Sequence, residues 1–398
     1  MPEAVLLAGS LGLGHEMMAR GCAELLEASG WRTRTLDCLS LMGPWPGGIG
    51  KGLFNSLVSA PGLYDAVHFA HLRTGSRVAW MMDWAASARL VPALRAELER
   101  KPADLLLSVF ATGASAAAKL KAALPAMRTV VLCTDVTPHR IWVTEGTDLF
   151  LVTSAAAAES VRRYLPGAHI SVVPPPVRRA FYTAPSREQA RQALGVPADA
   201  FCALVMDSGW GLGPLAESVS ALADAGLHVL AVAGRRRRVE RRFRELAART
   251  PRVTAFGFTS RVPALMAAAD VVVTLPGATT CSEARAIGRR LLLLDLMPGH
   301  GRDNLLHELE LGGAHSCLVT PEGVTASILA LQEEVARERT ASGAAARPAP
   351  HPELRRPDRR KQDVPGWEPA YLAALRQIGL ELPSPVMTPP PPTLRPVA

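Results

Sequence analysis

The first 173 residues alternate between short apolar runs and amphipathic stretches. Residues 4–10 form an apolar run of strand length, residues 11–15 a glycine-containing turn, and residues 16–30 a stretch with apolar positions at helical spacing. A second strand is predicted at 31–39. Further strands are predicted at 104–110, 129–135, 148–154 and 170–174, with Ala-rich helical stretches between them. This alternation predicts a parallel sheet covered by helices on both faces.

Consecutive prolines interrupt this pattern within 172–191. Because proline is excluded from helix interiors and central strands, we predict an interdomain linker at 174–190. The alternation then restarts with an apolar run at 201–207, a glycine loop at 208–213 and a helix at 214–226. Further strands are predicted at 228–234, 252–258, 271–277 and 291–296.

Two domains and a tail follow from these patterns. The fold class is α/β, with two Rossmann-like doubly wound domains at 1–173 and 191–337, and sheets of this kind bind ligands at the carboxyl ends of their strands. The remaining segment, 338–398, is rich in Ala, Pro and Arg, and its proline-rich end lacks the apolar pattern of a packed core. Near 366–380 helical spacing returns, which predicts an amphipathic helix that docks back on the body.

The composition is that of a globular protein with anionic partners. Of the 398 residues, 48% are hydrophobic and 20% are charged, which excludes a disordered chain. The formal net charge of +8 favours acidic lipid, nucleotide or nucleic acid without choosing among them. The main basic run, Arg235 to Arg238 with Arg241 and Arg242, is typical of a solvated helix face. Because this run has no interleaved aromatic residues, we expect no nucleic-acid partner.

Cysteine spacing and apolar-run length bear on localisation. The six cysteines are widely scattered and include no C-x-x-C pair, which predicts reduced core residues in a cytoplasmic protein. The chain starts without a secretory-signal pattern, and no apolar run approaches the ~20 residues needed to cross a bilayer. Any membrane association is therefore expected to be peripheral.

A glycine loop with Gly9, Gly12 and Gly14 ends the first predicted strand and is followed by His15. Glycines allow a tight turn and a close approach to a ligand, and the next helix offers free N–H groups. His15 is a candidate base, since a reference pKa of about 6.5 lets it accept a proton at neutral pH. Equally, the glycines serve strand–helix packing and His15 caps the helix. A dinucleotide site with Asp37 as ribose ligand is disfavoured, because the spacing is not G-x-G-x-x-G.

The segment 271–288 combines a strand, a loop of small residues and a helix. Thr279, Thr280 and Ser282 offer hydroxyls to phosphate oxygens, and Glu283, placed in the first turn of the helix, suits two ribose hydroxyls. The alternative is that Ser282 or Thr280 caps the helix and Glu283 complements the helix dipole.

Three other segments carry candidate binding groups. The loop 208–213 has glycine at alternate positions and suits a diphosphate, while 297–304 follows a strand and offers polar side chains to sugar hydroxyls. Residues 39–69 mix aromatic residues, Trp45 among them, with leucine, glycine and Lys51. This mixture favours an interfacial membrane segment, although a lid or core helices would have a similar composition.

The order of these motifs resembles the monogalactosyldiacylglycerol synthase group of family-28 glycosyltransferases and their bacterial diacylglycerol glucosyltransferase relatives, up to about Leu329. In the first half, the resemblance lies in GLGHEMMARG (12–21), GPWPGGIGKGLFN (43–55), CTDVTPHRIWV (133–143) and VVPPPVRRAF (172–181). In the second half, it lies in VAGRRRRVERRF (232–243), FGFTSRVPALMAAADVVVT (256–274), PGATTCSEA (276–284) and MPGHGRDN (297–304).

The resemblance implies a GT-B fold, in which the two domains face a central cleft. It implies an inverting hexose transfer from a UDP-sugar, held mainly by the C-terminal domain, to a lipid such as diacylglycerol, met by the N-terminal domain. No metal and no cofactor are implied. The expected location is cytoplasmic, at the anionic inner face of the cell membrane. A soluble acceptor, or nucleotide binding without turnover, remains the alternative.

The resemblance also assigns roles to single residues. His15 matches the position of the proposed base. The acceptor-side residues would be Gly12, Gly14, Trp45, Asp135, His139 and Trp142. The donor-binding residues would be Gly209, Gly211, Gly213, Gly234, Arg235, Phe258, Gly277, Thr279, Thr280, Glu283, Pro298, Gly299, His300 and Asn304. The chain departs from the family at Leu275, where a lysine is usual, and at His300 and Gly301, where Gln-Glu is usual.

Overall fold

The computed structural model describes residues 1–10, 13–43, 68–72, 74, 76–133, 135–207, 213–297, 299–342 and 367–383. These residues form two compact units. The first unit takes in the described residues of Met1–Arg178, Pro298–Asn304 and Pro357–Thr388. The second takes in those of Arg179–Met297 and Leu305–Arg356, so it begins inside the predicted linker.

A parallel six-stranded sheet forms the centre of the first unit, in the order β2-β1-β3-β4-β5-β6. Its strands are β1 (Glu3–Ala8), β2 (Arg32–Asp37), β3 (Leu105–Ser108), β4 (Arg128–Cys133), β5 (Leu149–Val152) and β6 (Ile170–Val172). Its helices are α1 (Gly14–Ala28), α2 (Cys38–Leu41), the π-helical turn η1 (His68–Leu72), α5 (Arg77–Arg100), α6 (Ala111–Lys121), the 3-10 turn η2 (Arg140–Trp142), α7 (Ala155–Tyr164) and α16 (Glu368–Gln377). Strands β1, β3 and β5 are buried along their whole length, as expected when helices cover both faces.

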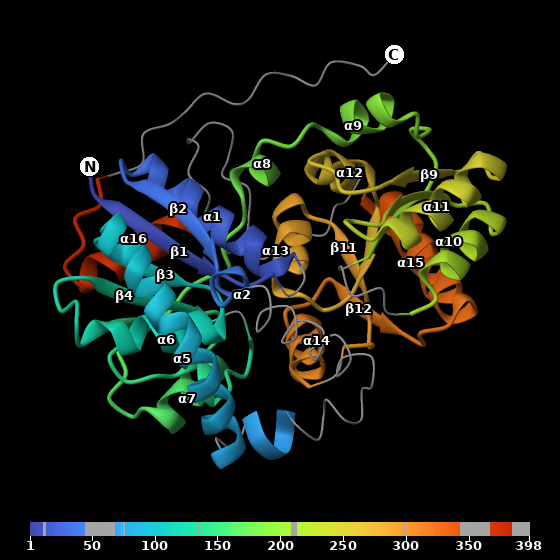
Figure 1. Cartoon of the computed structure of the whole chain (residues 1–398). Helices are drawn as coiled ribbons and strands as arrows, with labels where there is room; N and C mark the ends of the chain where they lie inside the picture. The colour runs from blue at the N-terminus through green and yellow to red at the C-terminus, as the bar shows by residue number, and fades with distance from the viewer. Residues whose placement is uncertain are drawn as a thin grey trace. The chain divides into compact units, whose positions relative to one another are not determined.

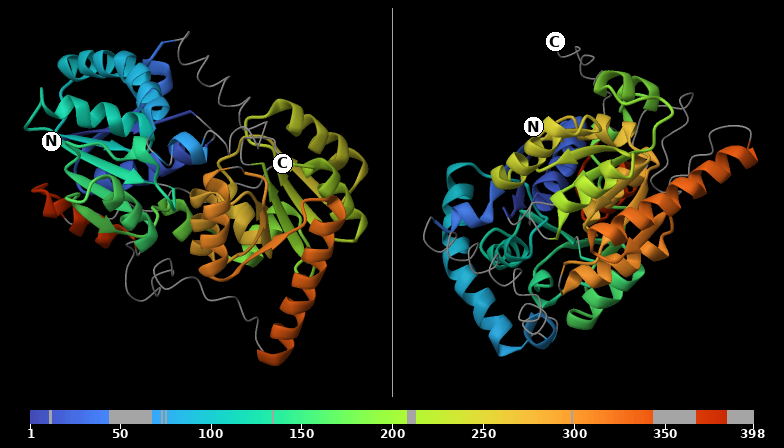
Figure 2. Two further views of the ribbon diagram at one scale, coloured as in Figure 1. Left: turned by 90° about the horizontal axis from the view of Figure 1, so that it is seen from below. Right: turned by 90° about the vertical axis from the view of Figure 1, so that its right-hand side faces the viewer.

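The second unit is built in the same way, around a parallel sheet of order β12-β11-β10-β7-β8-β9. Its strands are β7 (Cys202–Met206), β8 (His228–Val232), β9 (Val253–Phe256), β10 (Val271–Thr274), β11 (Arg290–Leu294) and β12 (Ala314–Cys317). Its helices are α8 (Arg179–Tyr182), α9 (Arg187–Leu194), α10 (Leu215–Asp224), α11 (Arg237–Arg249), α12 (Val262–Ala268), α13 (Ala278–Ile287), α14 (His300–Glu310), whose first turn groups with the first unit, and α15 (Pro321–Ser342). Figures 1 and 2 show helices flanking the sheet within each unit.

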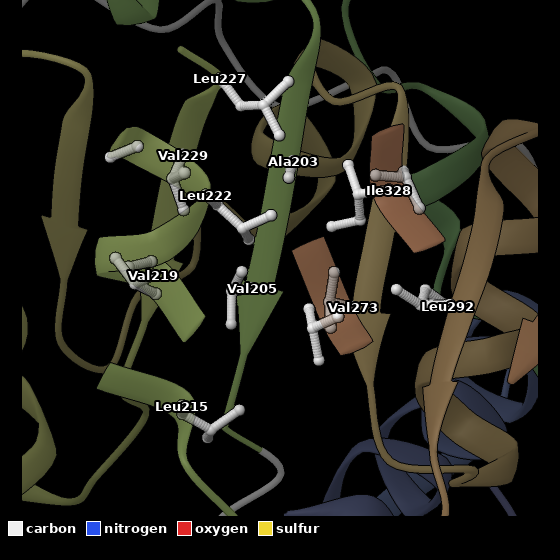
Figure 3. Close-up of a cluster of buried hydrophobic side chains, with 14 of the residues drawn as sticks. Ala203, Val205, Leu215, Val219, Leu222, Leu227, Val229, Val273, Leu292 and Ile328 are labelled. Atoms are coloured by element: carbon white, nitrogen blue, oxygen red, sulfur yellow. The ribbon is translucent and has the colours of Figure 1, made fainter. Parts of the chain in front are cut away.

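The core of the second unit joins its central strands to the covering helices. Figure 3 shows Val205 of β7 and Val273 of β10 beside Val219 and Leu222 of α10 and Ile328 of α15, all buried. The two central strands are apolar runs, so neither face of the sheet is polar at this point. The sheet is therefore stabilised by burial of both faces.

Every strand predicted from the apolar runs has a counterpart in the structure. Strand β12 (Ala314–Cys317) was not predicted, because its sequence AHSC lacks an apolar run. It lies at the edge of the sheet, where it pairs with β11 and needs less apolar surface. The predicted second strand ends early, because Cys38 and Leu39 begin α2.

Helix α16 packs on the first unit. Trp367, just before this helix, is fully buried and donates a hydrogen bond from Nε1 to the carbonyl oxygen of Val177, 2.9 Å away. Ser171, in β6, donates a 3.3 Å hydrogen bond to Gln377 at the other end of the helix. The helix lies within 366–380, where the sequence predicted helical spacing.

Two general features concern the cysteines and the helices. The six cysteines form no disulfide with one another, and five of them are buried. No helix in the described part of the chain combines the length and the apolar character needed to cross a membrane.

Candidate functional site

The strand order of the first unit reverses between β1 and β3. From β1 the chain moves outward to β2, and from β3 it continues in the opposite direction to β6. The loops after β1 and β3 therefore diverge at their carboxyl ends, which is where open parallel sheets bind ligands. The loop after β1 leads to His15, and the loop after β3 contains Val109 and Phe110.

A hydrogen bond joins the first turn of α1 to the loop after β3. The Nδ1 atom of His15 lies 2.6 Å from the carbonyl oxygen of Val109. A carbonyl oxygen only accepts, so Nδ1 carries the proton, and the neutral ring has its lone pair on Nε2. Phe110 contacts the ring edge-on, with centroids 5.3 Å apart. The sequence-predicted base is thus held in the tautomer that leaves Nε2 available to accept a proton.

The environment of His15 favours its neutral form. Burial lowers the pKa of His15 below its ordinary value and is the largest effect, and His300 lowers it further. The Asp135 carboxylate and the hydrogen bond to Val109 act in the opposite direction without outweighing burial. His15 is therefore unprotonated at neutral pH, as a general base requires.

Asp135, just after β4, is the acidic group whose charge acts on His15. It is buried and accepts a 2.8 Å hydrogen bond from Nε1 of Trp142. Burial alone would raise the pKa of Asp135, but His300, His139 and the Trp142 hydrogen bond together lower it. The carboxylate is therefore charged, and it stabilises a proton that arrives on a neighbouring imidazole.

His139 has the opposite tautomer to His15. Its Nδ1 accepts a 3.3 Å hydrogen bond from the backbone N–H of Ile141, so Nε2 carries the proton of the neutral ring. Burial lowers the pKa of His139 to about 4, with Asp135 opposing and His68 and His300 adding to the shift. His139 is thus a neutral hydrogen-bond donor rather than a second base.

Two further histidines lie in the same cluster of the first unit. The ring of His68, in η1, lies 6.0 Å from that of His139 and 6.0 Å from that of His300. The segment of His300 is fixed by Asn304, whose Oδ1 accepts a 3.3 Å hydrogen bond from the backbone N–H of Val136. His68 was not singled out from the sequence, because it lies in the segment 39–69, which was interpreted from its apolar and aromatic residues.

The geometry of α1 bears on one alternative for the first glycine loop, the capping of the helix by His15. Leu13 is the N-cap residue and makes no side-chain capping bond, so the reading of His15 as a helix cap is wrong. Asp37 instead accepts hydrogen bonds from the backbone N–H groups of Ser10 and Leu39 and from the hydroxyl of Ser40. Its carboxylate caps α2 and holds the glycine loop, so this geometry favours a structural role.

The second unit has its own reversal of strand order, between β7 and β10. Gly213 follows β7 with a φ of +83°, which glycine adopts readily. Gly234 follows β8 with a φ of +58°, and the guanidinium of Arg235 lies 4.6 Å from the centroid of the Phe258 ring, which follows β9. The ring is more than half exposed, so it holds the Arg235 cation at a surface.

The loop after β10 leads into α13. Helix α13 begins at Ala278, and its N-cap, Gly277, has no side-chain cap. A Cβ atom at Gly277 would meet nothing within 4 Å, so there is open space beside the backbone where the helix begins. Thr279 is buried and Thr280 half-buried, both in the first turn.

The position of α13 corrects two expectations. Glu283 lies in the second turn and not in the first, because the helix begins five residues before it. Neither Thr280 nor Ser282 caps the helix, and Ser282 donates a 2.7 Å hydrogen bond to the carbonyl of Ala278 within the helix. Glu283 is buried at this depth, which removes the simple explanation that it complements the helix dipole at an exposed end.

The burial of Leu275 accounts for one departure from the family pattern, in which this position is usually a lysine. Its side chain is buried in the core of the second unit, and its carbonyl accepts a 2.7 Å hydrogen bond from Gly277. A lysine at this backbone position would have to leave the core to keep its charge solvated. The departure at Leu275 thus strengthens the core and places no side chain at the loop.

A buried ion pair in the last turn of α13 was not predicted from the sequence. Arg285 of α13 donates hydrogen bonds of 2.9 and 2.8 Å, from Nε and Nη2, to one carboxylate oxygen of Glu308 in α14. Nη2 also donates to the Glu308 carbonyl. The pair ties the helix that carries Glu283 to α14, and charges 23 residues apart in the sequence give no signal of such a contact.

Some predicted residues cannot be placed. Gly12, Trp45, Gly209, Gly211 and Pro298 lie outside the described residues. Gly14 begins α1, and Gly299 has a φ of +65° just before α14. Gly301 lies in the first turn of α14 and is buried. Within the described ranges, no group of three or more His, Cys, Asp or Glu side chains has the arrangement of a metal site.

Comparison with known proteins divides the chain into two matching regions. Residues 21–177 match the family described as monogalactosyldiacylglycerol (MGDG) synthase. Residues 214–352 match the family described as glycosyltransferase family 28 C-terminal domain.

Individual relatives are modest in identity. A probable chloroplastic monogalactosyldiacylglycerol synthase of Glycine max is 22% identical over 78% of this chain, which spans 61% of that protein's length. A processive diacylglycerol beta-glucosyltransferase of Bacillus licheniformis is 26% identical over 46% of this chain and 48% of its own. Among solved structures, a UDP-glucosyltransferase from Polygonum tinctorium covers 96% of this chain and 99% of its own, with a TM-score of 0.57 and 14% identity.

The predicted fold class is confirmed by these likenesses and by the two parallel sheets. The site roles assigned to single residues stay predictions. In sequence, the chain resembles the monogalactosyldiacylglycerol synthase group in its first half and family 28 glycosyltransferases in its second, which confirms the resemblance predicted from the motifs.

Proposed function

We propose that the protein is an inverting glycosyltransferase that transfers a hexose from a UDP-sugar to a lipid hydroxyl such as that of diacylglycerol. The matches to the synthase family and to the family 28 domain support this reaction class. The observation that carries the proposal is the 2.6 Å hydrogen bond between His15 Nδ1 and the Val109 carbonyl, because it provides a neutral base.

In the proposed reaction, the second unit holds the donor and the first unit holds the acceptor. The acceptor hydroxyl transfers its proton to Nε2 of His15 as its oxygen bonds to the anomeric carbon. The bond between that carbon and the diphosphate oxygen breaks, and its electron pair leaves with UDP. The imidazolium that forms is stabilised by Asp135, whose carboxylate acts electrostatically on His15.

The donor contacts follow from the loops of the second unit. The N-terminal end of α13 and the Arg235 cation suit the diphosphate, whose negative charge grows as the bond breaks. Glu283 would accept hydrogen bonds from the ribose hydroxyls. Because fixed cations and helix N–H groups supply the charge stabilisation, we propose a reaction without a metal or a cofactor.

The acceptor class implies a place of action. We propose that the protein works at the cytoplasmic face of the cell membrane and associates with it peripherally. The net charge of +8 favours an anionic lipid surface.

The test is transfer of radiolabel from a panel of UDP-sugars to a total membrane-lipid extract, with and without EDTA. The proposal predicts a labelled product that partitions into the organic phase, that EDTA leaves unchanged, and that the His15→Ala variant fails to form. A labelled product that stays in the aqueous phase would assign a soluble acceptor. UDP binding without transfer or hydrolysis from any donor would contradict the proposed enzyme.

A further inference from the structure

The start of α5 exposes a cluster of large apolar side chains. Trp80 is 68% exposed, Met81 57% and Trp84 59%, and Val78 and Met82 are also exposed. We call these five residues the α5 patch. Large exposed apolar clusters on a folded protein mark interaction sites, since each exposed indole leaves apolar surface in water.

The rest of the helix is an ordinary core helix. Leu90, Leu94 and Leu98 follow one another at helical spacing and are buried in the core of the first unit. Among the residues of α5 that precede Ser87, only Ala79 is buried. The apolar residues of the patch therefore lie outside the core. In Figure 1 the start of α5, in light blue, extends below the sheet of this unit.

A polar anchor holds the exposed half in place. Lys119 of α6 donates hydrogen bonds of 2.6 Å to Asp83 and 2.7 Å to Ser87, both on α5. These bonds join the patch to a helix of the core, so the patch is presented on a fixed element.

The patch has the side-chain arrangement of an interfacial helix. Arg77, Trp80, Met81 and Trp84 stand at positions i, i+3, i+4 and i+7, so they share one face of the helix. Indole rings prefer the headgroup region of a bilayer, where their apolar body and N–H group are both satisfied. An arginine on the same face reaches the lipid phosphates.

The charges around the patch select the kind of surface. Asp83 is the one acidic residue in the half of α5 that carries the patch, from Arg77 to Arg89, and Lys119 neutralises it in an ion pair. Arg77 and Arg89, on either side of the patch in the sequence, are exposed on the same helix. This local excess of positive charge complements an anionic lipid surface and disfavours a basic partner.

We propose that the α5 patch inserts into the headgroup region of a bilayer that contains anionic phospholipid. The inference rests on the proposed function, since a lipid acceptor has to be taken from a membrane. It assigns the insertion to α5, which is separate from residues 39–69, where the sequence predicted an interfacial segment. Trp80 and Trp84 supply the apolar contact, and Arg77 supplies the attraction to phosphate.

The experiment measures binding of the full chain to vesicles by co-sedimentation. Vesicles of phosphatidylcholine with phosphatidylglycerol are compared with vesicles of phosphatidylcholine alone. The variants are Trp80→Ser with Trp84→Ser, and Arg77→Glu. The matched control, Val172→Ser with Leu318→Ser, removes two apolar residues that are also exposed but lie outside the patch.

The inference predicts at least about tenfold weaker binding to the anionic vesicles for both patch variants and wild-type binding for the control. Transfer to lipid dispersed in detergent should be unchanged in the patch variants. Equal binding of wild type and patch variants would overturn the inference, whereas loss of transfer in every variant and in the wild type would contradict only the proposed function. A dimer in sedimentation velocity that the tryptophan substitutions abolish would also overturn it, because the patch would then pair two copies of the chain.

Discussion

His15 and Val109 are joined by a 2.6 Å hydrogen bond across the point where the strand order of the first unit reverses. The bond determines which ring nitrogen is protonated, because a carbonyl oxygen only accepts. It also fixes the direction of the Nε2 lone pair, since rotation of the ring would break it. A base of this kind needs no carboxylate on its second nitrogen, and Asp135 is left to act through its charge.

The pH dependence of activity tests the role of Asp135. Burial lowers the pKa of His15, so activity should fall only below the ordinary histidine range as the base becomes protonated. The Asp135 carboxylate raises that pKa, and Asp135→Asn should therefore move the acid limb of kcat/KM to lower pH and lower the plateau by about 10- to 100-fold. Trp142→Phe keeps the carboxylate and should move the limb much less. A limb that moves to higher pH in Asp135→Asn would refute the assignment.

Stability at acid pH tests the environment of His139. Its pKa of about 4 lies below the ordinary value of 6.5, so the unfolded chain takes up the proton first as the pH falls. The stabilising contribution is complete above pH 6.5 and is lost between 6.5 and about 4, which corresponds to about 3 kcal/mol. His139→Gln should lack this loss, so the difference in unfolding free energy between wild type and variant should change with pH across that window. Denaturant unfolding at several pH values measures it, and parallel pH profiles would show that His139 is not buried as described.

Glu283 carries the proposed recognition of ribose. Glu283→Gln keeps the size of the side chain but loses its charge, so UDP affinity should fall about tenfold through weaker hydrogen bonds. Glu245→Gln, on the exposed face of α11, is the control and should leave UDP binding unchanged. Calorimetric titration with UDP gives both values. Unchanged affinity in a folded Glu283→Gln protein would remove this residue from the donor site.

Gly9 tests the packing beside His15. A Cβ atom at this position would lie 2.6 to 2.7 Å from ring carbons of Phe110, so the ring that contacts His15 would have to move. We expect Gly9→Ala to lower the unfolding free energy by about 1–3 kcal/mol and to reduce transfer. In Gly167→Ala the new methyl group meets nothing within 4 Å, and stability should stay the same or rise slightly. Equal stability and activity of the two variants would contradict the close contact.

The sequence predicts the sheets well because their central strands are continuous apolar runs. Val271–Thr274 and Leu149–Val152 are examples. A short continuous apolar run is typical of a strand that is buried on both faces of a parallel sheet. Strand β12 escaped prediction, because an edge strand needs little apolar surface and AHSC supplies none. The start of α13 was misplaced for a similar reason, as Gly277 at the N-cap gives a weaker signal than the hydroxyl residues after it.

The sequence predicts the site residues that belong to a motif. It does not predict the tautomers and pairings of those residues, because these depend on contacts with distant segments. The glycine loop pointed to His15, but its tautomer depends on Val109, 94 residues away. The Arg285–Glu308 pair and the His68 contacts likewise join distant segments. The exposure of Trp80 and Trp84 at the start of α5 has no signal in the sequence, because apolar residues at helical spacing look the same on a buried and on an exposed helix face.

The role of His15 as the base is tested by the rate of sugar transfer to lipid in His15→Gln, with the UDP dissociation constant measured on the same protein. Glutamine retains a hydrogen-bond donor for Val109 but has no basic nitrogen. If His15 is the base, kcat should fall by about 10²- to 10⁴-fold while UDP binding stays at the wild-type value. Transfer at the wild-type rate in His15→Gln would contradict the assignment of His15 as the base.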